Sequence, residues 1–218
     1  MMRHLVLECK PLDNLLGGGI DYGGITEIYG VEGSGKTNLC LQAFKRYVPN
    51  KRVAWIYTEK FSTERFKQLV GGSDYRKTHR KLLGYNCSSL KEQVETIKRI
   101  SKLNSIGLLI VDSINAWYRV ELEKNKESVQ RSFINQLEEL ELMANERNIP
   151  VIITSQVYEN EQSIQPFAGK RIGMFAKSIL KLEKLERGVR KATLMKHRVN
   201  PKGMSCLFRI SAEGLVEV

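Results

Sequence analysis

The run Gly30-Val31-Glu32-Gly33-Ser34-Gly35-Lys36-Thr37 constrains this chain more than any other feature. Glycine at its first and sixth positions, followed by Lys and Thr, is the pattern of a phosphate-binding loop. The glycines let backbone N–H groups close around phosphate oxygens, and the helix that follows directs its positive N-terminal end at the same anion. These residues are therefore predicted to bind a nucleotide, with Lys36 along the β- and γ-phosphates as a catalytic group and the Thr37 hydroxyl as a ligand to Mg²⁺.

The sequence around this loop alternates strand and helix patterns, which is typical of a sheet flanked by helices. Residues 25–29 form a short apolar run before the loop, and residues 36–48 carry apolar side chains at helical spacing after it. The same reasoning predicts buried strands at 53–57, 108–111 and 151–155, and helices from Ser89 and over 128–148. Beyond residue 172 it predicts antiparallel strands at 179–185, 190–196, 204–210 and 215–218. The expected fold class is α/β, with a largely parallel twisted sheet and C-terminal antiparallel strands.

Three polar residues follow predicted strands, where the carboxyl edge of a parallel sheet meets the phosphate-binding loop. Asp112 ends an apolar strand and is predicted to orient Mg²⁺ and its waters. Glu59 is a candidate to deprotonate the water that attacks the γ-phosphate, although an acid in an exposed loop explains it equally well. Gln156 is a candidate γ-phosphate contact, with a purely structural polar residue as the alternative.

The positive charge of the chain is concentrated near its C-terminus. The 218 residues carry 35 Lys and Arg against 24 Asp and Glu, a formal net charge of +11. Residues 165–209 hold 12 of the basic residues and 2 of the acids, so nearly the whole excess lies in this segment. It indicates either a solvated Lys-rich face or a surface for a polyanion such as DNA.

Several classes of protein are disfavoured by the sequence. The cysteines Cys9, Cys40, Cys87 and Cys206 form no C-x-x-C pair, so neither a structural zinc site nor a disulfide framework is expected. The longest run free of charge covers 11 residues, 148–158, and a membrane span needs about 20. The first eight residues include Arg3 and Glu8, which does not fit a secretion signal. We therefore expect a cytoplasmic protein that does not bind membranes.

In order and type, these motifs resemble the ATPase core of the RecA/RadA recombinases, and among them its short archaeal paralogues. The resemblance rests on residues 12–37, the pair Thr58-Glu59, LLIVDS ending at Ser113, and residues 152–157. It implies a single RecA-like ATPase domain over residues 1–218, with ATP and magnesium as cofactors. It also implies that Glu59 activates water, Asp112 serves the metal, Gln156 senses the γ-phosphate and Arg65 stacks on adenine, although one residue is missing between Glu59 and Arg65 relative to the family's spacing.

The chain also departs from that family. It begins almost at the core, so we expect neither the family's N-terminal helical DNA-binding domain nor the linker strand that docks on a neighbouring subunit. The family's two DNA-binding loops correspond to residues 119–128, which are mixed in charge, and 158–172, which include Lys170 and Arg171. The predicted DNA-binding residues are Lys170, Arg171, Arg190, Lys191, Lys196 and Arg198. The run 196–203 also resembles the Lys-x-Arg element with which RecA-like ring helicases reach a neighbour's γ-phosphate.

Three functions remain open at this point. The first is a nucleoid-associated accessory protein of recombination and repair, a monomer or dimer that binds ATP and DNA with weak turnover. The resemblance implies that it would assist the RadA recombinase and Holliday-junction resolvases without full strand exchange. The second is a self-assembling motor ATPase, similar to KaiC or a ring helicase, that uses Lys196 and Arg198 in trans. The third is a nucleotide-gated protein adaptor without a direct role on DNA.

Overall fold

The computed structural model describes residues 4–48, 51–58, 62–71, 75–123, 126–160 and 163–218. Its centre is a nine-stranded sheet among these residues. The strand order is β13 (Leu215–Val216), β12 (Ser205–Ile210), β11 (Val189–Lys196), β10 (Ala176–Lys184), β3 (Gly24–Tyr29), β7 (Pro150–Ser155), β6 (Ile106–Asp112), β4 (Arg52–Tyr57) and β5 (Leu82–Asn86). The six strands from β10 to β5 pair in parallel, and β11, β12 and β13 continue the sheet in antiparallel fashion.

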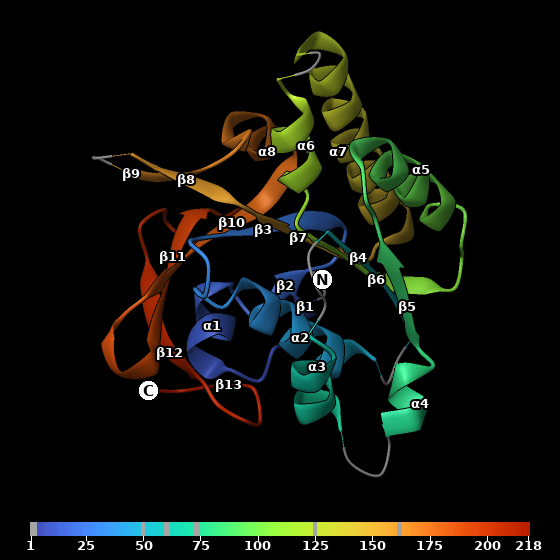
Figure 1. Ribbon diagram of the computed structural model, residues 1–218. Coiled ribbons are helices and arrows are strands. Elements are labelled where there is room, and N and C mark those ends of the chain that lie inside the picture. The colour runs from blue at the N-terminus through green and yellow to red at the C-terminus, as the bar shows by residue number, and fades with distance from the viewer. Residues whose placement is uncertain (1–3, 49–50, 59–61, 72–74, 124–125, 161–162) are drawn as a thin grey trace.

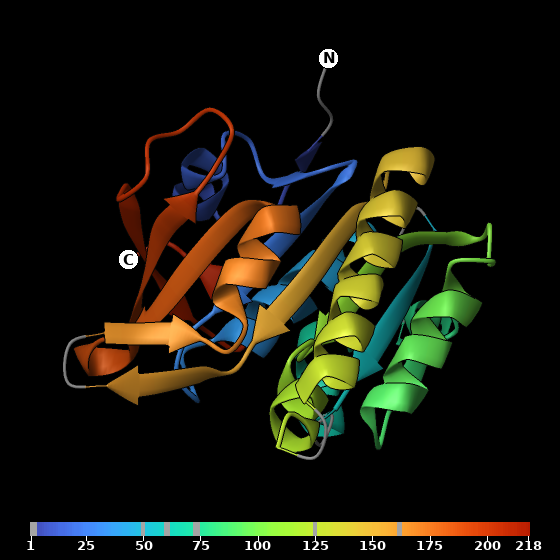
Figure 2. The ribbon, with the colours of Figure 1, turned by 90° about the horizontal axis from the view of Figure 1, so that it is seen from above.

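Helices cover both faces of this sheet, giving three layers (Figures 1 and 2). One face packs against α1 (Lys10–Leu15), α2 (Lys36–Tyr47) and α3 (Thr63–Val70), with α4 (Tyr75–His79) beside α3. The opposite face packs against α5 (Leu90–Ile100), α6 (Ala116–Glu121), α7 (Lys126–Arg147) and α8 (Gly169–Phe175). No helix among the described residues is long and apolar enough to cross a membrane.

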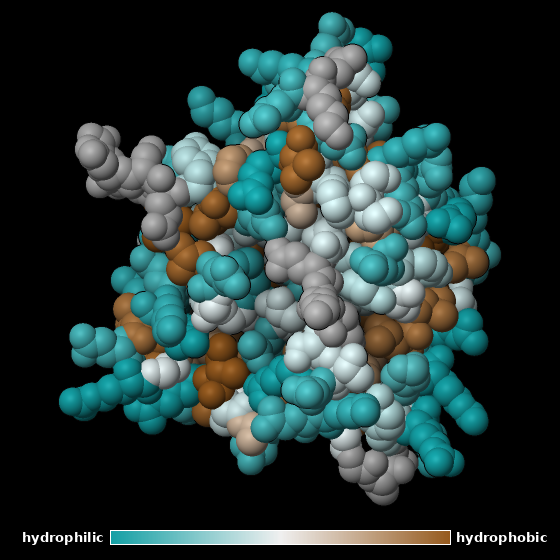
Figure 3. All heavy atoms as spheres, viewed as in Figure 1, coloured by the Kyte–Doolittle hydropathy of each residue, from teal (hydrophilic) through white to brown (hydrophobic). Residues whose placement is uncertain are grey.

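The central strands are apolar on both faces because both faces are covered. In β4, Trp55 is buried on the α2 face and Ile56 on the α7 face. In β6, Ile110 is likewise buried on the α2 face and Val111 on the α7 face. This two-sided burial explains why the central strands read as continuous apolar runs. Outside the core, the face in Figure 3 is mainly hydrophilic, and its apolar side chains form small separate groups.

The antiparallel part of the sheet contains one irregularity that matters for the site. Strand β11 pairs with β10 so that Leu194 lies opposite Leu180 and Lys196 lies opposite Ile179. Met195 is therefore an extra residue on β11, as in a β-bulge. Because side chains alternate between the faces of a strand, an extra residue moves everything after it to the other face. The side chains of β11 up to Leu194 thus alternate regularly between the two faces of the sheet. Lys196 points to the face opposite the one that this alternation would give it.

Three small elements lie outside the main sheet. Near the N-terminus, β1 (His4–Leu5) pairs with β2 (Ile20–Asp21). A hairpin of β8 (Val157–Asn160) and β9 (Ser163–Pro166) projects beyond the sheet beside α8 (Figure 2). A 3₁₀ turn, η1 (Glu186–Gly188), joins β10 to β11.

The predicted α/β class is confirmed, and so are the strands and helices that flank the phosphate-binding loop. The elements that were not predicted are β1, α1, β2, α3, α4, β5, α6, η1, the β8–β9 hairpin and α8. The last two occupy the segment 158–172 that the sequence treated as a loop. Strand β10 also differs from the prediction, because it joins the parallel sheet through β3 as well as the antiparallel part through β11.

Candidate nucleotide-binding site

The phosphate-binding loop lies between β3 and α2, as predicted. Its backbone requires glycine: Gly30 has φ 158° and Gly35, the residue before α2, has φ 108°. A side chain on Gly30 would also meet the Leu182 carbonyl oxygen of β10 at 2.2 Å. The Lys36 ammonium donates to the Gly30 and Val31 carbonyl oxygens at 2.7 and 3.0 Å, so it lies across the loop. This arrangement places a cation and the N-terminus of α2 beside one concave backbone.

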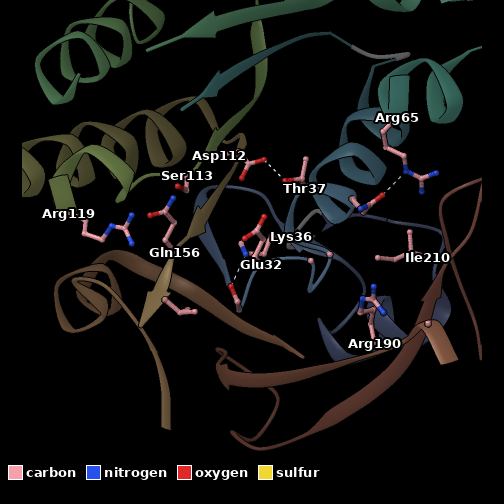
Figure 4. A pocket seen from close by; sticks show the side chains of 16 residues that line it. Glu32, Lys36, Thr37, Arg65, Asp112, Ser113, Arg119, Gln156, Arg190 and Ile210 are labelled. Carbon is pink, nitrogen blue, oxygen red and sulfur yellow. Dashed lines mark hydrogen bonds between the residues drawn. The ribbon is translucent and has the colours of Figure 1, made fainter. Parts of the chain in front are cut away.

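The loop forms the floor of a cavity of about 750 Å³ (Figure 4). Cavities of roughly 300–1,000 Å³ are typical of small-molecule sites in proteins. Its charged lining contains four cations and two acids, which favours an anionic ligand: Lys36, Arg65, Arg119, Arg190, Glu32 and Asp112. Gln156 also lines the cavity, so most of the predicted nucleotide residues are brought together.

Thr37 and Asp112, which the sequence predicts as magnesium ligands, are in direct hydrogen-bond contact. Asp112, at the end of β6, accepts a hydrogen bond from the Thr37 hydroxyl at 2.8 Å and another from the Thr154 hydroxyl at 2.5 Å. These bonds fix the orientation of the carboxylate on the loop side of the cavity. A carboxylate and a hydroxyl at this spacing offer oxygen ligands, which suit Mg²⁺. Thr37 and Asp112 therefore fit a bound magnesium ion.

Arg65 is held rigidly at the other end of the cavity. Its guanidinium donates to Asn38 Oδ1 at 2.8 Å, Gln68 Oε1 at 2.5 Å and the Ser211 carbonyl oxygen at 2.7 Å. Burial lowers the pKa of Arg65, but an arginine remains charged at neutral pH. A planar guanidinium fixed on several sides can stack on an aromatic base. Its position beside the cavity fits the predicted adenine contact.

Gln156 lies at the opposite end, where a buried asparagine holds the backbone. Asn115 is fully buried, accepts from the Gln156 N–H at 2.8 Å and donates to the carbonyl oxygens of Gln156 and Phe167 at 2.9 and 3.0 Å. It thereby closes the base of the β8–β9 hairpin. Arg119 lines the same end of the cavity, with Cζ 5.3 Å from the centre of the Phe167 ring. Glu59, the predicted water-activating residue, lies outside the described residues.

The six predicted DNA-binding residues separate into two groups. Lys170 and Arg171 lie on α8, and the Lys196 ammonium donates to the Gly173 carbonyl oxygen of that helix at 2.8 Å. Arg198 lies near enough to Lys177 to help lower the pKa of Lys177, for which burial is the larger cause. We call Lys170, Arg171, Lys196 and Arg198 the basic cluster. Arg190 and Lys191 lie toward the other end of β11, about 20 Å and about 16 Å from Lys196 along the strand.

Sequence reasoning missed several residues of the cavity. Asn38, Arg119 and Ile210 were not assigned to it, and Arg190 was assigned to DNA. Asn38 directly follows the phosphate-binding loop in the first turn of α2. That position could have been used to predict that it lines the cavity. Arg119 and Ile210 carry no motif, because only the folded arrangement of α6 and β12 brings them to the loop.

A loop of this type at the edge of a parallel sheet, with an oriented aspartate and a fixed guanidinium, defines a nucleotide-binding protein with a RecA-like core. A family model described as Rad51 matches residues 2–218, and the chain belongs to this family. It is 39% identical to the DNA repair and recombination protein RadB of Methanococcoides burtonii, over 98% of this chain and 97% of that protein. The protein of the same name from Thermococcus sibiricus is 38% identical, with 98% and 95% covered.

A solved structure agrees with these relatives. The crystal structure of the RadB recombinase is similar with a TM-score of 0.86 and 36% identity, covering 98% of this chain and 99% of that one. The short archaeal paralogues indicated by the sequence are thus confirmed as the relatives of this chain.

Proposed function

We propose that this chain is an ATPase of DNA recombination and repair that binds ATP with Mg²⁺, turns it over slowly, and binds DNA through the basic cluster. One observation carries the nucleotide part: Lys36, Thr37, Asp112, Gln156 and Arg65 line one cavity around the phosphate-binding loop. Membership of the Rad51 family supports ATPase activity and a role in recombination. The names of the relatives support repair as the setting.

Each residue has a part in this proposal. Lys36 neutralises charge on the β- and γ-phosphates, and Arg65 orients the base. Thr37 and Asp112 hold Mg²⁺, which when bound supplies further charge neutralisation on the phosphates. Gln156 hydrogen-bonds the γ-phosphate, and Glu59 is the base that orients and deprotonates the attacking water.

The DNA part depends on the basic cluster. Lys170 and Arg171 lie on α8, Lys196 ends β11, and Arg198 follows two residues later. The hydrogen bond from Lys196 to Gly173 joins β11 to α8. Positive side chains gathered in this way attract a phosphate backbone without reading sequence. We propose that the protein acts in the cytoplasm at the nucleoid as a monomer or dimer, and that it assists the RadA recombinase and Holliday-junction resolvases.

The nucleotide part is tested with Lys36→Ala and Thr37→Ala. Both variants should lose ATP binding measured by calorimetry, and Thr37→Ala should lose the magnesium dependence of whatever binding is left. Intact ATP affinity in Lys36→Ala would contradict the proposal. DNA binding should survive in both variants, because the basic cluster lies on other elements.

The DNA part is tested by changing Lys170, Arg171, Lys196 and Arg198 together to alanine. DNA affinity should fall, and the slope of log K against log salt for duplex DNA should shrink by about 0.9 for each phosphate contact removed. A matched control changes four exposed lysines elsewhere: Lys67, Lys91, Lys98 and Lys102. An equal effect of both variants would mean that net charge alone accounts for DNA binding.

A self-assembling motor ATPase remains the alternative function, and the position of Lys196 is compatible with it. Lys196 contacts α8 and does not line the nucleotide cavity of its own chain. A contact between Lys196 and ATP would therefore have to be made with the nucleotide of a neighbouring subunit. Mass in solution with and without ATP separates the two functions. A stable hexamer whose turnover depends on Lys196 and Arg198 would favour the motor, whereas a monomer or dimer with turnover unaffected by their removal supports our proposal.

A further inference from the structure

Arg190 lies in the nucleotide cavity and not with the basic cluster. Its side chain lines the cavity together with the phosphate-binding loop, Gly188 and Ile210 (Figure 4). Figure 4 shows Arg190 and Arg65 on different sides of Ile210. The sequence predicted a DNA contact for Arg190 because it stands in the basic segment.

The register of β11 explains this position. Ala192 and Leu194 are buried among the side chains that face α2, the helix that follows the phosphate-binding loop. Arg190 precedes them at the strand period of two, so it points to the same face. The extra residue at Met195 then moves Lys196 to the other face, toward α8. Two cations six positions apart thus serve different surfaces.

The turn before β11 borders the cavity beside Arg190. Gly188 has φ 76°, and a Cβ placed on it would meet no atom within 4 Å. Ile210, on the neighbouring strand, approaches the loop closely enough that a Cβ on Gly35 would lie 2.9 Å from its Cδ1. Gly188, Ile210 and Gly35 all line the cavity, and so does Arg190.

The guanidinium of Arg190 also has donors that are not used within the described chain. Nη1 donates to the carbonyl oxygen of the adjacent Val189 at 3.1 Å. Nε is buried and has no hydrogen-bond partner among the described residues, and no ion pair with Arg190 occurs there. A buried donor without a partner is costly, and a guanidinium matches the oxygens of a phosphate group.

We propose that Arg190 binds the α-phosphate of the nucleotide held in its own chain. The assignment rests on the proposed ATP binding. Lys36 lies across the loop, where the β- and γ-phosphates are proposed to bind, and Arg190 lines the cavity beside Ile210, on the side away from Arg65 (Figure 4). The part of a nucleotide between base and β-phosphate would run from the loop past Ile210 toward Arg65, and its only anionic group is the α-phosphate.

The experiment compares Arg190→Ala and Arg190→Lys with the wild type, using adenosine, AMP, ADP and ATP as competitors of a fluorescent ADP analogue. Arg190→Ala should weaken AMP, ADP and ATP by a common factor of roughly ten or more, since hydrogen bonds to charged groups are worth that much. Adenosine should be unaffected. Arg190→Lys should recover part of the loss, because a lysine keeps the charge but not the fork of donors.

Lys184→Ala is the matched control, because Lys184 is exposed and pairs directly with Arg190 across β10 and β11. It removes the same charge from the same place on the sheet and should leave nucleotide affinity unchanged. Circular dichroism and urea unfolding of each variant separate a lost contact from a lost fold.

The remaining outcomes are distinct. If the wild type binds no nucleotide, the proposed function fails and the role of Arg190 fails with it. If the wild type binds ATP and Arg190→Ala binds it equally well, only the role of Arg190 is overturned. Loss of DNA affinity with nucleotide affinity intact would return Arg190 to the DNA surface, and a loss confined to ATP would place it at the γ-phosphate, against the proposal.

Discussion

Glu27 is a buried carboxyl group in the middle of β3, and replacing it should stabilise the protein at alkaline pH. The residue is 1% exposed and its Oε1 accepts a hydrogen bond from the Ser155 hydroxyl at 2.7 Å. Burial raises the pKa of Glu27 from 4.5 to about 7, against the lowering effect of the Ser155 hydrogen bond. Between these two values the folded state keeps a proton that the unfolded state releases.

The sign of the pH dependence follows from that difference. Where the folded state binds more protons than the unfolded state, the free energy of unfolding falls as pH rises. The loss begins near pH 4.5, is complete above about pH 7, and amounts to about 3 kcal/mol at 1.36 kcal/mol per pKa unit. Glu27→Gln keeps an oxygen that can accept from Ser155 and removes the ionisation. We therefore expect the variant to equal the wild type below pH 4.5 and to exceed it by about 3 kcal/mol at pH 8.

Urea unfolding followed by circular dichroism at pH 5, 6.5 and 8 measures this difference. Glu183→Gln is the control, because the Glu183 carboxylate is partly exposed and pairs with Lys181 at 2.9 Å. Its removal should give no gain at any of the three pH values. A gain for Glu27→Gln that is the same at pH 5 and pH 8, or a loss at pH 8, would refute the reasoning.

Two further predictions concern buried groups. Asn115→Ala leaves the Gln156 N–H and the carbonyl oxygens of Gln156 and Phe167 without their side-chain partner, so it should cost about 3 kcal/mol or more of unfolding free energy. Urea unfolding against Asn135→Ala, on the exposed side of α7, checks this, and a cost below about 1 kcal/mol would contradict it. Burial raises the pKa of the Cys40 thiol well above its ordinary value and that of Cys206 to about 12, so both should react slowly with iodoacetamide at pH 8 in the native protein and fully in urea. Mass spectrometry of the two states gives the comparison, and rapid native alkylation of either thiol would be against it.

The fold was predictable where one signal dominated. Residues 108–111 are apolar without interruption, which is typical of a strand covered on both sides, and β6 is such a strand. Strand β5 was missed because its side chains are half-buried or exposed and include Gly84, so neither alternation nor a continuous apolar run marks it. Helix α8 was missed because Gly169 and Gly173 lower its helix propensity, and its packing against α7 and β10 compensates for that.

The candidate site shows where sequence patterns stop being informative. A motif such as the phosphate-binding loop works because adjacent residues act on one ligand, so their order in the sequence is also their order in space. In the basic segment 165–209, residues that are close in the sequence do not all act on one ligand or lie on one surface. A strand sends alternate side chains to opposite faces, and a single extra residue at Met195 reverses the alternation within β11. Arg190 and Lys196 therefore contribute equally to the net charge but border different surfaces, and only the register of β10 against β11 separates a cation of the nucleotide cavity from one of the basic cluster.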